Sequence, residues 1–332
     1  MNLTEDNLDV AACWDQAENI NLDYNPNYIE INEDKRNTII DDPSDYEKGD
    51  KRKEEKETKK SNTNNNSNNS SNDKGGKAGY SGKGKVYYLT KNGKNWNLNE
   101  HIQYTLNQGA TSDGTYIYVV FKGDDSHAVI GKFDLEARKL IKKSEVMNLG
   151  HANDITYDSK RRKLFVTRRE TNDLSIVMID PNTFSHQTVN INIPKSLKGA
   201  NVGAIKAFNG IAYDKSKGQL LIRGRYANSQ LVYVNDNFKA TKVLHIRKWF
   251  DIPTQGMELV NDRVIYSQSL LQYRSSVTSY SKSNGNKIKS TSLGVHGELE
   301  GVFYHNGYLY GITYDKSGKN KSLIYVIDKA YY

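Results

Sequence analysis

The sequence has almost no cysteine and no long apolar run. Cys13 is the only cysteine among 332 residues, so the chain can form neither an internal disulfide nor a cluster of thiolate metal ligands. No run of 18 or more apolar residues occurs, and the acidic N-terminus lacks the basic region and apolar core of a signal peptide. We therefore expect a cytoplasmic protein, or an extracellular or cell-surface one whose export segment is not part of this sequence.

The common catalytic motifs are also missing. The sequence contains no glycine-rich phosphate loop between a strand and a helix, no Gly-x-Ser-x-Gly elbow and no His-Glu-x-x-His pair. Its seven histidines show no close ligand spacing. We therefore predict no cofactor, with Ca²⁺ held by a ring of Asn, Gln and Glu oxygens as the weaker alternative.

Charge divides the chain into three parts. Residues 1–47 carry 13 acidic and 2 basic residues, a net charge of −11, and show no helical or strand period. Residues 48–83 carry a net +5 and include an Asn/Ser-rich tract from Asn62 to Asn72. Neither part can bury enough apolar surface to offset its chain entropy, which predicts an acidic disordered tail and a linker. The remainder, residues 84–332, carries +14 and is predicted to be one folded domain.

A short pattern occurs five times in this last part. Each occurrence has a polar residue, then glycine or aspartate, then an apolar residue, and a β-rich run follows about ten residues later. The middle positions are Gly109, Asp154, Gly210, Gly256 and Gly301. Their spacings of 45, 56, 46 and 45 residues are typical of propeller blades made of short strands. The long spacing contains the segment Pro194–Lys206, which we expect to be a loop.

The first four repeats each predict four strands, whereas the fifth supplies only three before the chain ends. The isolated strand candidate Val86–Leu89 can complete the last blade and remove its open edge, with Lys91–Leu106 as a linker behind it. The sequence therefore predicts an all-β fold, a five-bladed β-propeller closed by an N-terminal strand. Four third strands end in an apolar residue followed by Asp or Asn, which we expect to bind turn amides: Asp134, Asp180, Asn235 and Asp328.

These repeats resemble bacterial propeller families of the NHL and YVTN type, whose blades pair a polar-Gly-apolar first strand with a Leu-Tyr-Val second strand. The stretch Gly150–Asp158, with the sequence GHANDITYD, is also similar to repeats in cell-wall-associated proteins of Gram-positive bacteria. The resemblance covers residues 85–332 and implies the architecture only. It carries no catalytic motif, and NHL and YVTN propellers usually have six or seven blades.

Residues that enter first strands and leave second strands should meet on one face around the propeller axis, as the fold class implies. One polar side chain per blade suits a polar ligand, and arginines would add charge-assisted hydrogen bonds to an anionic one. The predicted ligand-binding residues are Gln108, His151, Asn153, Asn209, Gln255, Glu298, Glu300, Arg168, Arg223 and Arg225. The alternative structural interpretation is a water-filled channel in which these groups bind one another.

The preferred function is a non-catalytic binding module, expected to be monomeric, of a surface or secreted protein. Its basic charge favours a polar or anionic glycan, or another polyanion, at the axial face. One alternative is a glycan-active lyase or glycosidase that uses His151 and Glu300 as acid and base. Another is a protein-interaction platform in an envelope or phage tail assembly, with its partner at the rim. Nucleic acid is not expected as a partner, because the basic residues are scattered and no recognition motif occurs.

Overall fold

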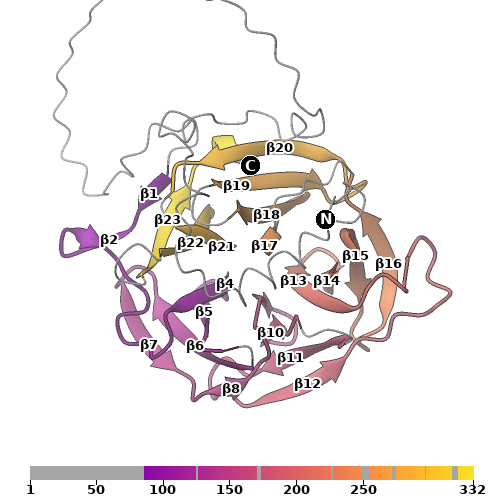
Figure 1. Ribbon diagram of the computed structural model, residues 1–332, viewed down its shortest axis with the longest axis horizontal. Coiled ribbons are helices and arrows are strands. Elements are labelled where there is room, and N and C mark those ends of the chain that lie inside the picture. Colours follow the sequence, from indigo (N-terminus) through magenta and orange to yellow (C-terminus); the bar gives the residue numbers. More distant parts are fainter. Residues whose placement is uncertain are drawn as a thin grey trace, which may run out of the picture.

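A computed structural model describes residues 86–332 except 125, 170–172, 226, 248–253, 271–273, 296 and 316–320. The described chain forms five blade sheets arranged around a central axis (Figure 1), together with a small two-stranded sheet. Four strands in each sheet run from the axis to the rim, so the prediction of an all-β, five-bladed propeller is confirmed. The predicted tail and linker, residues 1–83, lie outside the described residues.

The strands of the first four blades follow one another along the chain, from the innermost to the outermost. Blade 1 contains β4 (Leu106–Ser112), β5 (Ile117–Lys122), β6 (His127–Asp134), β7 (Lys139–Lys143) and the short β8 (Met147–Asn148). Blade 2 contains β9 (Asp154–Asp158), β10 (Lys163–Thr167), β11 (Ser175–Ile179) and β12 (His186–Asn190). Blade 3 contains β13 (Ala207–Asp214), β14 (Gln219–Arg225), β15 (Ala227–Val234) and β16 (Ala240–His245). Blade 4 contains β17 (Thr254–Val260), β18 (Arg263–Leu270), β19 (Arg274–Ser281) and β20 (Lys287–Leu293).

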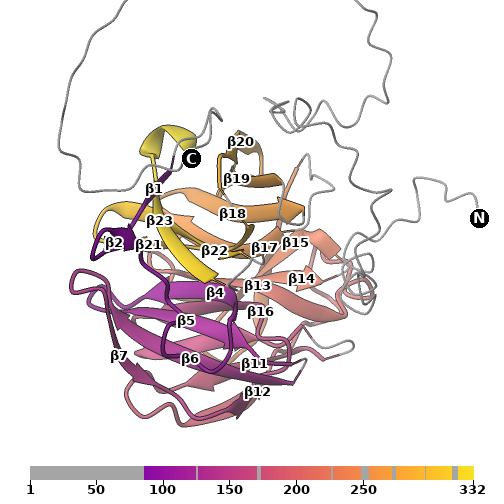
Figure 2. The same ribbon diagram turned by 60° about the vertical axis from the view of Figure 1, so that its left-hand side comes forward.

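Blade 5 is built from both ends of the described chain. Its inner strands are β21 (Glu298–His305), β22 (Tyr308–Asp315) and β23 (Lys321–Ile327), and a 3₁₀ turn at Lys329–Tyr331 follows. The outermost strand is β1 (Val86–Tyr88), which pairs antiparallel with β23 so that Val86 faces Ile327 (Figure 2). The predicted closure by an N-terminal strand is therefore confirmed.

The segment after β1 is more ordered than the predicted linker. It contains a small hairpin of β2 (Thr90–Lys91) and β3 (Lys94–Asn95). Trp96, Leu98 and Ile102 then enter the core between blades 5 and 1. The sequence does not predict this packing, because three apolar residues spread over seven positions have neither a strand nor a helix period.

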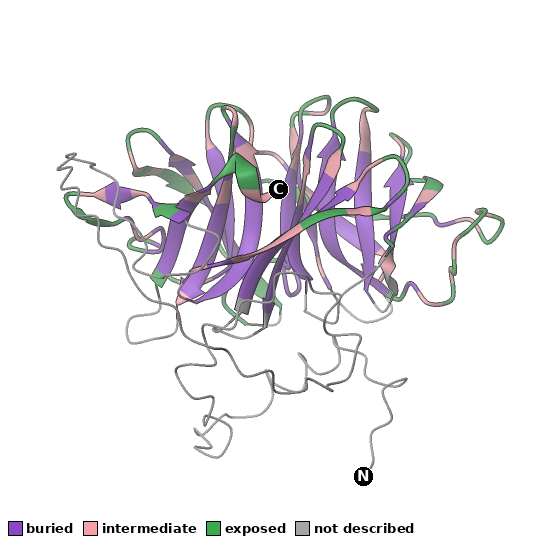
Figure 3. Ribbon diagram, turned by 90° about the horizontal axis from the view of Figure 1, so that it is seen from above, coloured by how far each residue is buried: buried purple, intermediate pink, exposed green. Residues whose placement is uncertain are grey.

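Hydrophobic cores lie at the seams between neighbouring blades, one at each of the five seams. Alternate side chains of a strand enter different cores: Ile117, Val119 and Phe121 of β5 face blade 5, while Tyr118 and Val120 face blade 2. All five side chains are fully buried. Buried strands consequently read as continuous apolar runs, and exposure is concentrated at turns and outer edges (Figure 3).

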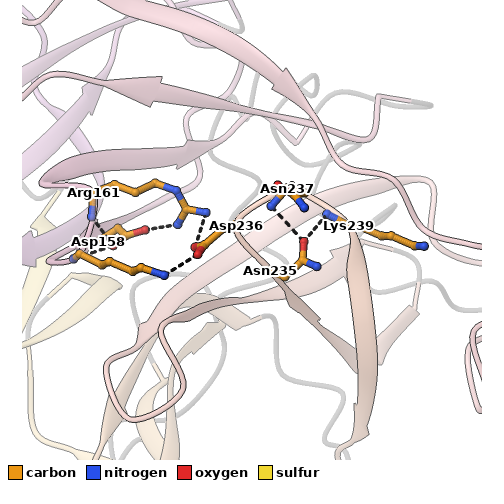
Figure 4. A network of polar contacts seen from close by, with 7 residues as sticks. Asp158, Arg161, Asn235, Asp236, Asn237 and Lys239 are labelled. Carbon is orange, nitrogen blue, oxygen red and sulfur yellow. Dashed lines mark hydrogen bonds and ion pairs between the residues drawn. The ribbon is translucent and has the colours of Figure 1, made fainter.

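Polar contacts also cross the seams. Between blades 2 and 3, Arg161 contacts the buried carboxylate of Asp158 and lies 2.8 Å from Asp236 (Figure 4). Lys282 of blade 4 lies 3.1 Å from Asp214 of blade 3. The remaining seams are crossed by hydrogen bonds from the Tyr157 amide to the Thr111 hydroxyl, from the Tyr304 amide to Glu258, and between Ser112 and His305.

The four aspartates and asparagines that end the third strands accept amide hydrogen bonds from the following turn, as predicted. Asp134 binds the Ala137 amide, and Asp180 binds the amides of Asn182 and Thr183. The equivalent acceptor in blade 3, the Asn235 side chain, binds the amides of Asn237 and Lys239 (Figure 4). In blade 5, Asp328 binds the Ala330 amide. These groups are structural.

Closure by β1 can be tested with two adjacent tyrosines. Tyr88 is 6% exposed and packs in the core between blades 4 and 5, whereas Tyr87 is 36% exposed. Tyr88→Ala should lower the free energy of unfolding by about 3 to 5 kcal/mol, since it removes a buried aromatic ring. Tyr87→Ala, the matched control, should change it by less than about 0.5 kcal/mol. Equal effects in chemical denaturation would contradict the burial of β1.

Glu258 makes the seam between blades 4 and 5 sensitive to pH. Burial raises the pKa of its carboxyl to about 7, although the amides of Leu259 and Tyr304 and the charge of Lys215 oppose this shift. Because the pKa of Glu258 is higher in the folded state than in the unfolded state, its contribution to stability is fully present at a pH below the unfolded-state pKa. This contribution is lost as the pH rises to the folded-state pKa of about 7. Relative to Glu258→Gln, the unmodified protein should therefore lose roughly 2 to 3 kcal/mol of stability between pH 4 and pH 8. A constant difference between the two denaturation series would show that Glu258 keeps an ordinary pKa.

Candidate functional site

The repeated triplet marks a β-bulge at the start of each innermost strand. The pairing register slips at Asn107/Gly109, Phe208/Gly210, Thr254/Met257 and Leu299/Gly301. In blade 2, both Asn153 and Asp154 face Thr167. An extra residue at a bulge redirects its side chain. The redirected residues are polar and all at most 8% exposed: Gln108, Asn153, Asn209, Gln255 and Glu300.

Glycines at the next position let the inner strands approach closely at the axis. A Cβ atom on Gly109 would lie 2.9 Å from the Asp154 Cα, and one on Gly301 would lie 3.1 Å from the Gly109 Cα. A Cβ atom on Gly256 would lie 3.2 Å from the Gly301 Cα. The inner strands of blades 1, 2, 4 and 5 thus approach one another closely at this layer. Three of them have a glycine there, and the fourth has Asp154. The four inner strands are therefore closely packed at this layer.

The carboxylate of Asp154 joins three blades. It accepts hydrogen bonds from the Ile155 amide at 3.0 Å, the Ile211 amide at 2.9 Å and the Met257 amide at 3.0 Å. Burial raises the pKa of this carboxyl well above its ordinary value, while the three amides and the charge of Arg223 oppose the shift. Three amide donors on one buried carboxyl make Asp154 the polar centre of the fold.

Asn153 and Arg223 hold neighbouring blades together next to this centre. The Asn153 side chain donates to the carbonyls of Asn209 at 2.7 Å and Gln255 at 3.0 Å. The fully buried Arg223 donates through Nη2 to the carbonyls of Asn209, Thr254 and Gln255, at 2.9, 2.7 and 3.2 Å. Burial lowers the pKa of Arg223 to about 10. Arg223 therefore serves the ring itself, and we assign it no ligand contact.

A cationic cluster lies where blades 1 and 2 meet at the same end of the inner strands. The Lys122 ammonium is 3.0 Å from Nδ1 of His151, and the Arg169 guanidinium is 2.6 Å from Nε2 of the same ring. Lys122, His151 and Arg169 are 7 to 8% exposed. Arg225 of blade 3 extends the cluster by donating to the Arg169 carbonyl at 2.6 Å.

Arg168 and Arg169 are adjacent but point to different parts of blade 2. Arg168 contacts Thr188 on the outermost strand and Asp173, at 3.3 and 3.5 Å. Arg169 has a left-handed backbone with φ of 60°, which breaks the strand alternation and turns its side chain to His151. Left-handed non-glycine residues are uncommon and often occur at functional sites.

The structure thus joins a subset of the predicted residues. Contacts link Asn153 with Asn209 and Gln255, and the Gln255 side chain donates to Glu298 at 3.0 Å. Gln108 donates to the carbonyl of its own neighbour, Asn107. Glu300 is buried at its bulge. The predicted set omitted Lys122, Asp154 and Arg169, and the only indication of Asp154 was its place in a series of glycines.

The described residues contain neither a cluster that could hold a metal ion nor a helix that could span a membrane. No three His, Cys, Asp or Glu side chains within these residues are placed to hold a metal ion. None of the helices in the described part of the chain is long and apolar enough to cross a membrane.

Comparisons with known proteins show similarity in fold. No family model and no curated protein matches the sequence. Among solved structures, the tail fibre of Staphylococcus aureus phage P68 is similar with a TM-score of 0.50 and 16% identity, over 68% of this chain and 50% of that one. The RRP9 WD40 repeats are similar with a TM-score of 0.42 and 10% identity, over 68% of this chain and 95% of that one. U3-55K is similar with a TM-score of 0.44 and 9% identity, over 68% of this chain and 96% of that one. The chain is a β-propeller, and identities this low indicate nothing finer.

Replacing Asp154 tests its role at the axis. Asp154→Ala should lower the free energy of unfolding by roughly 3 to 6 kcal/mol, because three amides lose their acceptor. Asp154→Asn keeps the size of the side chain and one acceptor oxygen, so the free energy of unfolding should fall by less than in Asp154→Ala. Thermal and urea denaturation would measure both. A loss below about 1 kcal/mol for Asp154→Ala would exclude the carboxylate as the link between blades.

Proposed function

We propose that the protein is a non-catalytic binding module whose axial face holds an anionic group of a glycan or related polymer. The observation that carries this proposal is the cluster of Lys122, His151 and Arg169 beside the polar ring. A neutral imidazole has one acceptor nitrogen, yet cationic donors face both nitrogens of His151. The cluster therefore brings two cationic groups to one imidazole, and an anion is the ligand that such groups favour.

The surroundings of the cluster favour a polar ligand. The packed glycine layer supports binding on the face of the propeller, without passage through the axis. Amide side chains from three blades, those of Gln108, Asn153 and Gln255, lie at the bulges and are the groups that hydrogen-bond sugar hydroxyls. The net charge of +14 on residues 84–332 would attract a polyanion from a distance.

A surface location is part of the proposal. It is supported by the similarity of Gly150–Asp158 to repeats of wall-associated proteins, and it agrees with the fold shared with a phage tail fibre. Catalysis by His151 is less favoured, because both of its ring nitrogens contact cations. A general base needs a nitrogen directed at the substrate.

The two adjacent arginines provide a matched test. Binding of dextran sulfate and of unmodified dextran should be measured by calorimetry at low and high salt. Arg169→Ala should weaken dextran sulfate binding by about 1.5 to 3 kcal/mol, on the order of tenfold to a hundredfold, since it removes a charge-assisted bond. Arg168→Ala removes the same charge, but the Arg168 side chain points to the outermost strand. The affinity of this variant for dextran sulfate should therefore stay within about twofold of the unmodified protein.

Three outcomes would count against the proposal. Equal losses for both arginine variants would indicate general charge attraction without a site. Equal binding of dextran sulfate and dextran would remove the need for an anion. Shorter products after incubation with either polymer, absent with His151→Ala, would instead favour the lyase or glycosidase alternative.

A further inference from the structure

A groove lies at the seam between blades 5 and 1, beside the closing strand. Its volume is about 420 Å³, within the usual range of ligand pockets. One wall is formed by residues 87–90, and the others by the β6–β7 turn and the β21–β22 turn. Strand β21 runs from Glu298 at the axial site to His305 in this groove, so the two sites lie at opposite ends of one strand.

Four tyrosines are among the twelve residues that line the groove. Tyr87 and Tyr308 are 36% and 52% exposed, and Tyr88 and Tyr310 also contribute to the lining. The Tyr310 ring is held in place by Phe303, with ring centroids 5.2 Å apart and planes inclined by 11°. Tyrosine rings present electron-rich faces that attract cations.

One exposed carboxylate lies in the lining of the groove, although the domain as a whole is basic. Burial lowers the pKa of His305, and the carboxylates of Asp113, Glu136 and Asp134 oppose this shift through their charge. Glu136 lies in the lining itself and is exposed. The one guanidinium in the lining, that of Arg138, donates to the Thr90 carbonyl. The groove therefore contains one exposed carboxylate, that of Glu136, and Asp113 and Asp134 act on its His305 through their charge.

One cation already uses this surface. The ammonium of Lys329 lies 5.5 Å from the centroid of the Tyr308 ring, within the range of a cation–π contact. Tyr308 remains about half exposed despite this contact. The protein itself thus shows which kind of group the ring accepts.

We propose that the groove binds an alkylammonium group, of which the trimethylammonium head of choline is the simplest probe. Tyrosine faces would contact the methyl groups and the diffuse positive charge, and Glu136 would supply the counter-charge. Such a group needs no directed hydrogen bonds, which suits contact with the faces of the tyrosine rings. This site is independent of the anion site at the axis.

The test compares choline with 3,3-dimethylbutan-1-ol, a neutral molecule of the same shape, using the full chain and ligand-observed NMR titration. Choline should bind in roughly the millimolar range, and the neutral analogue at least several-fold more weakly. Tyr308→Ala should weaken choline binding about two- to thirtyfold, and Tyr308→Phe should retain most of it. Ile288→Ala, which removes another exposed apolar side chain outside the groove, should have no effect.

Glu136→Gln separates charge from shape, because it should weaken choline binding and leave binding of the neutral analogue unchanged. Equal affinities for choline and its analogue would overturn the proposal, as would undiminished choline binding by a folded Tyr308→Ala variant. Lys83 and Lys85 immediately precede β1. Choline binding by Lys83→Gln/Lys85→Gln but not by the unmodified chain would show that the basic linker fills the groove, and would also overturn a role for an external ligand.

Discussion

The ring depends on the hydrogen bonds that the buried carboxylate of Asp154 accepts. Its three amide partners belong to the inner strands of blades 2, 3 and 4, and the glycines of blades 1, 4 and 5 pack against it or against one another. A buried carboxyl is costly unless hydrogen bonds compensate it. Here the cost is offset by satisfying backbone donors that the bulges have released from normal strand pairing. The same bulges that require an acceptor at the axis also place polar side chains around it.

The two candidate sites follow from this construction. At one end of the inner strands, the bulged residues and the cluster around His151 present donors for an anion. At the other end, the β21–β22 turn of blade 5 meets blade 1 and the closing strand, and tyrosines from β1 and β22 share one groove. A module with both would bind opposite charges at opposite ends of β21. A zwitterionic polymer could engage both sites only by extending across a blade.

Much of the fold could be predicted because each blade repeats the same few local rules. Turn residues, triplets and apolar runs recur with a nearly constant period, so the four strands of blades 1 to 4 and the three of blade 5 could be predicted from the repeats. Trp96, Leu98 and Ile102 were missed because they fill a seam singly and carry no period. Periodicity identifies repeated elements, and it does not identify the connections between them.

The site could be predicted less well, for reasons visible in single residues. Arg168 was predicted to bind ligand and Arg169 was not, yet the left-handed backbone at Arg169 reverses their directions. Arg223 has the charge of a ligand-binding residue but is fully buried, an uncommon place for arginine. Gln108, Asn153, Asn209 and Gln255 were grouped as first residues of the repeated triplet, and the structure places each of them at a bulge. Their ligand-binding role is still a prediction.

The pairing of β1 with β23 has a consequence for synthesis of the protein. Residue 86 emerges from the ribosome long before residue 327, its partner in the last blade. Domains generally fold as their chains are completed, and contacts between residues far apart in sequence slow that process. Blades 1 to 4 can form in order while β1 waits without a partner, but the ring cannot close until the final strand is released. A nascent chain stalled before residue 321 would therefore carry an open propeller with unpaired strand edges, which can pair with strands of other chains.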